Sequence, residues 1–204
     1  ATVLFRLGDP IAAGVADYLN NGSEAGASFA SRAGDHHDAI HYFGMGAGGS
    51  YSPNASDRGL LVMNHEAITP VFLHVNGPTI VNGARTVNDE VVKELNAHGV
   101  SVIEVAKTGS AVSYSRSSTY NRRITMLETP FRFTGPAAGS AWLRTAADPN
   151  GTTPIGTLNN CAGGVTPWGT VLSGEENFNQ YFVGGDGAPA ELKPSLARYG
   201  ISTT

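Results

Sequence analysis

Gly59-Leu60-Leu61-Val62-Met63-Asn64-His65-Glu66 predicts a short β-strand followed by a polar end. Because the apolar run from Gly59 to Met63 is continuous rather than alternating, we expect this strand to be buried on both faces. A second segment, Gly169-Thr170-Val171-Leu172-Ser173-Gly174-Glu175-Glu176, begins 110 residues later with the same layout. Each is a glycine, a β-prone run and then a carboxylate just past the end of the run, which indicates two equivalent strands.

The separation of these two segments is compatible with a β-propeller. Propeller blades repeat about every 40–50 residues, so the interval would span two to three blades. Equivalent strands of successive blades converge on one axis, and the residues at their ends would then lie close together. The 26 glycines and 11 prolines among 204 residues also predict frequent turns between short strands. The predicted fold class is therefore all-β (β-rich), as part of a β-propeller.

One short helix is predicted within this β-rich chain, near residues 89–98. Asn88 can cap it, Asp89 and Glu90 suit its first turn, and Gly99 can end it. For the segments around it we expect a strand over 100–105, half-exposed strands over 111–134, and a long loop or series of turns over 135–169.

Composition and charge exclude several classes of function. A net charge of −4 with only 13 lysines and arginines argues against a nucleic-acid-binding groove. No apolar stretch approaches the roughly 20 residues of a membrane span. The single cysteine, Cys161, cannot form a disulfide within the chain. The sequence begins as if already inside a mature domain, so we expect any export signal to have been removed.

The densest candidate site surrounds Cys161, in the run Asn159-Asn160-Cys161-Ala162-Gly163-Gly164, and continues at Glu175 and Glu176. A thiolate is a good ligand for a transition metal, and carboxylates supply the oxygen donors that Ca²⁺ requires. Together they would suit a cluster of two kinds of metal. Taken alone, Cys161 could instead be a small buried apolar residue, and the two glutamates could belong to a solvated turn.

Glu66 and Asp38 are further candidate ligands for a hard cation. His65-Glu66 opens like the zinc-protease pattern, but Thr69 stands where the second histidine is needed and Pro70 follows, which excludes that class. Asp38 lies in the polar run Asp35-His36-His37-Asp38 and has the oxygen donors of a calcium ligand. Both carboxylates could instead be ordinary surface groups.

Taken together, these motifs resemble the PhoX-type secreted bacterial alkaline phosphatases. The residues that carry the resemblance are Asp35-His36-His37-Asp38, Gly59 to Glu66, the block from Asn160 to Thr170, and Glu175-Glu176-Asn177. The resemblance implies an exported enzyme, carried by the twin-arginine route, with its active site on the axis of a β-propeller. It also implies Ca²⁺ and Fe³⁺ as cofactors, with Glu66, Cys161 and a carboxylate of the Glu175-Glu176 pair as matching metal ligands and Asp38 as a weaker match.

The implied activity is hydrolysis of phosphomonoesters, with a small phosphoester as substrate and a periplasmic or secreted location. The alternatives are a non-catalytic calcium-binding propeller module and a hydrolase of another ester class on the same fold. Because the catalytic domain of this family is much longer than 204 residues, we expect residues 1–204 to be the N-terminal portion of a single larger domain. Its partner would be the missing remainder of that domain or another copy of the chain.

Overall fold

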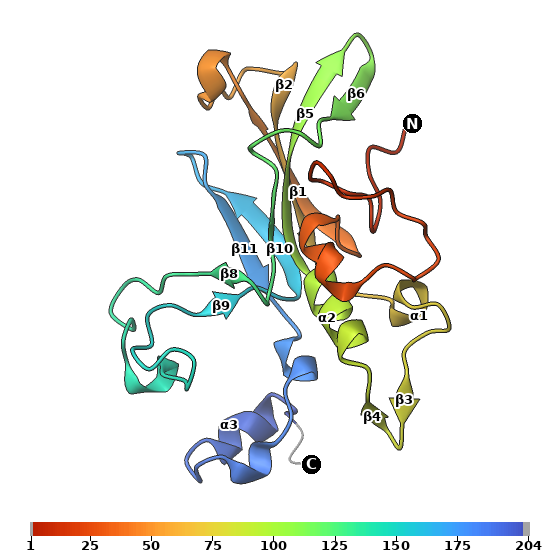
Figure 1. Ribbon diagram of the computed structural model, residues 1–204. Helices are drawn as coiled ribbons and strands as arrows, with labels where there is room; N and C mark the ends of the chain where they lie inside the picture. The colour runs from red at the N-terminus through yellow and green to blue at the C-terminus, as the bar shows by residue number, and fades with distance from the viewer. Residues whose placement is uncertain (1, 202–204) are drawn as a thin grey trace.

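A computed structural model describes residues 2–201 of the chain. Its centre is an antiparallel sheet in the order β1-β2-β5-β6, with β7 also paired to β5 (Figure 1). The strands of this sheet are β1 (His37–Gly44), β2 (Arg58–His65), β5 (Gly99–Thr108), β6 (Ala111–Tyr114) and β7 (Arg122–Ile124).

Strand β2 lies between β1 and β5 and is the strand expected from the run Gly59 to Met63. Side chains alternate across a strand, so Met63 faces one side, where Phe5, Ile11 and Ile103 complete a buried core. Val62 faces the other side and lines a pocket of about 650 Å³. The strand is therefore apolar on both faces, but the prediction that both are buried is correct only for the first, because the second lines this pocket and is only partly covered.

The predicted helix is α2 (Asn88–Ala97), which begins one residue earlier than expected. The prediction that Asn88 caps it is wrong. Val87 occupies the cap position without a side-chain cap bond, and Asn88 is the first helical residue. The carboxylate of Asp89 instead accepts a hydrogen bond from the backbone N–H of Gly26, which ties the first turn of α2 to the 3-10 helix that begins at Gly26.

Helix α2 packs beside the 3-10 helix η1 (Gly26–Ser31), next to the short helix α1 (Pro70–Leu73). Phe29, Leu73 and Ala97 form a second buried cluster between these segments. Leading into α2 is the small hairpin of β3 (Ile80–Val81) and β4 (Ala84–Arg85). Helices α1 and α2 and the 3-10 helix η1 thus gather at one end of the central sheet (Figure 1).

Strands β10 (Asn160–Val165) and β11 (Val171–Glu175) form a separate hairpin beside the central sheet. Strand β11 was expected, but the prediction of a loop over 135–169 is wrong for residues 160–165. The Cys-Ala-Gly-Gly run has weak β propensity, and its extended form is set by pairing with β11. The remaining strands are β8 (Thr129–Pro130) and β9 (Ile155–Gly156).

The rest of the regular structure is short and helical. It comprises η2 (Ala47–Gly49), η3 (Ala141–Leu143), η4 (Phe178–Tyr181), η5 (Gly185–Gly187) and α3 (Lys193–Arg198). Among residues 2–201, no helix has the length and apolar character to cross a membrane. Strands and turns thus dominate, in agreement with the predicted β-rich class.

We expect Gly99→Ala to destabilise the fold at the junction of α2 and β5. Gly99 has a φ of 94°, and a Cβ there would collide with the carbonyl oxygen of Ile124. The free energy of unfolding, measured by chemical denaturation, should fall by more than about 2 kcal/mol.

Gly109→Ala is the matched control, since Gly109 also has a positive φ but has open space around its Cα. That change should cost only the backbone penalty, about 1–2 kcal/mol. Equal losses in the two variants would show that the contact with β7 does not constrain Gly99.

Candidate metal centre

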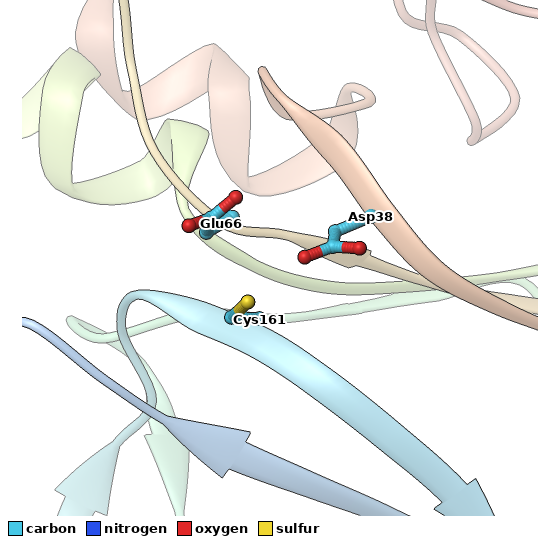
Figure 2. Close-up of side chains that lie close together, drawn as sticks. All are labelled: Asp38, Glu66 and Cys161. Atoms are coloured by element: carbon cyan, nitrogen blue, oxygen red, sulfur yellow. The ribbon is translucent and has the colours of Figure 1, made fainter.

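Three potential metal ligands from distant parts of the sequence converge at one end of the central sheet. Asp38 lies on β1, Glu66 follows the end of β2, and Cys161 lies on β10. One ligand atom from each lies within 4.8 Å of the others. Figure 2 shows the two carboxylates and the thiol pointing toward a common point. The structure thus brings together three of the five predicted ligands.

Irregular strand pairing aims two of these side chains. The register of β1 against β2 shifts between His37 and Ile40, and that of β10 against β11 shifts between Asn160 and Gly163. Asp38 and Cys161 fall inside these shifts. Such β-bulges turn a side chain out of the regular alternation and are common next to active sites. Regular pairing alone would not fix where these two side chains point.

Asn64, at the end of β2, holds the β10–β11 hairpin against the central sheet. Its Nδ2 donates to the backbone carbonyl of Cys161 at 2.8 Å, and its Oδ1 accepts from Ser173 Oγ at 3.1 Å. The ends of the two similar sequence segments therefore meet, as their layout predicts. In the sequence Asn64 stood out only as part of the polar end of the strand, beside the predicted ligand Glu66, and its bridging role was not predicted.

Close packing also brings β1 and β10 together at Gly163. A Cβ added to Gly163 would lie 2.6 Å from the Cβ of Ala39. Any larger residue would therefore push the strand carrying Cys161 away from the strand carrying Asp38. The missing Cβ of Gly163 thus allows a close approach between two neighbouring strands.

The backbone of Glu66 is fixed on both sides of its α-carbon. Its N–H donates to the carbonyl of His36 at 3.0 Å. Its own carbonyl accepts a hydrogen bond from Nδ1 of His98 at 2.9 Å. The side chain, half-buried, is left free to turn toward Asp38 and Cys161.

The thiol of Cys161 is held in its neutral form by its acidic surroundings. A hydrogen bond to the Asp38 carboxylate, partial desolvation, and the negative charges of Asp38, Glu176 and Glu66 raise its pKa to about 12. A thiol binds metal as the thiolate, so a cation here must displace that proton. Two carboxylates and a thiol in contact repel one another once ionised, and a bound cation would relieve this repulsion. The donor set therefore fits a cation.

Glu175 and Glu176 take different positions from each other. The Glu175 carboxylate accepts hydrogen bonds from the Thr157 hydroxyl and from the backbone N–H of Leu158, so it braces the loop before β10. Glu176 is exposed, and its charge contributes to the raised pKa of Cys161. Neither belongs to the group of three found within residues 2–201. Their role as ligands stays a prediction.

A half-buried basic group, Arg123, contacts the backbone of His98 near the site. Arg123 on β7 donates to Ser101 Oγ at 2.9 Å and to the carbonyl of Asn96 at 2.8 Å, and burial lowers its pKa to about 9. Burial is also the main cause of a lowered pKa at His65 and His98, and the charge of Arg123 adds to it. Nothing local in the sequence distinguishes Arg123 from the neighbouring Arg122, which is exposed.

The structure thus defines a β-rich protein with a candidate cation site made of two carboxylates and a thiol. A model of the family described as Alkaline phosphatase PhoX matches residues 1–204. The chain belongs to the PhoX alkaline phosphatase family, which confirms the predicted resemblance. A search of curated proteins gave no match.

One solved structure is similar over nearly the whole chain. It is that of Pseudomonas fluorescens PhoX in complex with vanadate, a transition state analogue. The two share 33% sequence identity with a TM-score of 0.85, and the match covers 99% of this chain and 32% of that one. The predicted fold class is confirmed by this likeness, while the chain spans about a third of the PhoX chain that it matches.

Replacing Asn64 with alanine should loosen the β10–β11 hairpin. Asn64 is only 2% exposed, so the change removes a buried hydrogen-bond partner from both the Cys161 carbonyl and the Ser173 hydroxyl. We expect the free energy of unfolding to fall by about 2–3 kcal/mol in chemical denaturation. Asn54→Ala, at an exposed position, should change it by less than about 0.5 kcal/mol. Similar small effects for both would argue against the bridging role.

Proposed function

We propose that this chain supplies part of the active site of a metal-dependent phosphomonoesterase. The observation that carries the proposal is the convergence of Asp38, Glu66 and Cys161, whose ligand atoms lie within 4.8 Å of one another. Family membership supports the reaction class. The vanadate complex of the similar Pseudomonas fluorescens PhoX supports chemistry at a phosphate-like group.

The donor set supports Ca²⁺ and Fe³⁺ as the cofactors. Carboxylate oxygens, such as those of Asp38 and Glu66, are the ligands that Ca²⁺ requires. A thiolate, as Cys161 would provide, favours a transition metal such as iron. The exposed Glu176 has the charge of an additional ligand and lies near enough to Cys161 to raise its pKa.

The residues of this chain hold and orient the reacting groups. Bound cations neutralise the charge that develops on a phosphoryl group and lower the pKa of water, so that no serine nucleophile is needed. The bulges of β1 and β10 aim Asp38 and Cys161, and His36 and His98 fix the backbone that carries Glu66. The substrate would be a small phosphoester.

The exposed apolar surface supports association with the remainder of a larger catalytic domain or with another copy. The pocket between β2 and the hairpin is open, and Leu172 and Trp168 of the hairpin are 59% and 76% exposed. The match to only 32% of the Pseudomonas chain supports the first partner. In this proposal residues 1–204 are the N-terminal portion of a propeller, in a protein exported to the periplasm or secreted.

Cys161→Ser tests the proposed iron ligand. A serine oxygen is a much poorer ligand for iron than a thiolate, so iron content should fall while calcium content changes less. Elemental analysis of the purified full protein would measure both metals. The exposed Glu128→Gln is the control and should retain both. Unchanged iron in Cys161→Ser would contradict the assignment.

The activity itself is tested with Glu66→Gln and a panel of esters. Loss of the carboxylate should reduce release of phosphate from an aryl phosphate at least about tenfold, because a charged ligand is lost. Chelation of the unaltered protein should have the same effect. Turnover of a phosphodiester or a lactone instead of a monoester would identify another ester hydrolase. Metal-dependent melting without any turnover would identify a calcium-binding module.

A further inference from the structure

His98 contacts the backbone of Glu66 and not its carboxylate. It is completely buried, directly after α2 and before the strand β5. Its Nδ1 lies 2.9 Å from the carbonyl oxygen of Glu66. Glu66 stands one residue beyond the last paired residue of β2, so this contact supports its backbone where the strand ladder has ended.

The hydrogen bonds of His98 define its tautomer. A carbonyl oxygen can only accept, so Nδ1 must carry the hydrogen that it donates to Glu66. The neutral ring then offers a lone pair at Nε2. The hydroxyl of Tyr181 lies 3.1 Å from that nitrogen and can donate to it. Nδ1 of His98 is thus the donor to Glu66 and Nε2 the acceptor from Tyr181, which gives the imidazole ring a single orientation.

Tyr181 comes from a third part of the chain. It lies in η4, just after the β10–β11 hairpin, and its ring meets that of His98 edge-on at 90° with centroids 5.1 Å apart. Tyr181, His98 and Glu66 therefore form a continuous contact path. It connects the segment that follows the hairpin to a candidate ligand on the central sheet.

We propose that His98 and Tyr181 are positioning residues that hold the backbone of Glu66 in the geometry needed for cation binding. The inference rests on the metal centre proposed above. The proposal predicts that a change at Tyr181, in the segment after β11, alters the affinity for the metal, although Tyr181 itself is not a ligand. Groups that orient a metal ligand typically change affinity by about 10–100-fold when they are removed.

The first test is Tyr181→Phe, which keeps the ring and removes only the hydroxyl. Ca²⁺ alone would be titrated by calorimetry into the chelator-treated full protein. We expect Ca²⁺ to bind about tenfold more weakly. The metal-free melting temperature should stay close to that of Tyr199→Phe, a matched change at an exposed tyrosine that packs on the nearby Phe178. Unchanged Ca²⁺ affinity, or an equal loss in Tyr199→Phe, would overturn the proposal.

The second test is His98→Asn, whose amide can still donate to the Glu66 carbonyl but offers nothing at the place of Nε2. Its Ca²⁺ affinity should match that of Tyr181→Phe, and combining the two changes should cause no additional loss, because they break one path. Additive losses would refute the coupling. If His98→Asn does not fold, the Tyr181→Phe result decides alone.

Asp38→Asn separates this inference from the function on which it rests. If Asp38→Asn abolishes Ca²⁺ binding while Tyr181→Phe leaves it intact, only the positioning role is wrong. If both bind Ca²⁺ as the unaltered protein does, the metal centre itself is wrong.

Discussion

The side-chain amide of Asn64 joins the two parts of the fold that carry the candidate ligands. Through it, the end of β2 binds the backbone of Cys161 and the hydroxyl of Ser173. Glu66 follows two residues after Asn64, just past the end of the same strand. The end of β2 therefore leads into the carboxylate of Glu66 and also holds β10, the strand that carries the thiol of Cys161, in place. The spacing between these two donors depends on this single buried amide and on the close approach of Gly163 to β1.

The acidic character of the cluster has a consequence for stability. Asp38 and Glu66 lie beside the thiol of Cys161 and contribute to raising its pKa to about 12. Without a cation, negative charge accumulates at the end of the sheet where three chain segments meet. A ligand that binds only the folded state stabilises that state. A cation at this position would thus tie β1, β2 and β10 together as well as serve chemistry.

Much of this arrangement could be predicted from sequence, because it follows from strand patterning and donor chemistry. The two similar segments predicted strand ends that meet, and Asn64 does contact Ser173. The soft and hard donors around Cys161 and Glu66 marked the site. The strand at 160–165 was missed because its glycines and alanine carry little β signal, and tertiary pairing outweighs propensity there. Glu175 was indistinguishable from Glu176 locally, yet its carboxylate binds the 157–158 loop.

Because of the two bulges, the site depends on the number of residues in β1 and β10 as well as on which residues they are. Each inserts extra chain into one strand, at Asp38 and at Cys161, while the partner strand stays regular. Removing one residue from either strand would restore strict alternation and send the donor to the opposite surface, with every ligand still present in the sequence. In relatives of this chain, a one-residue gap at these places would therefore signal a lost centre more surely than many substitutions around it.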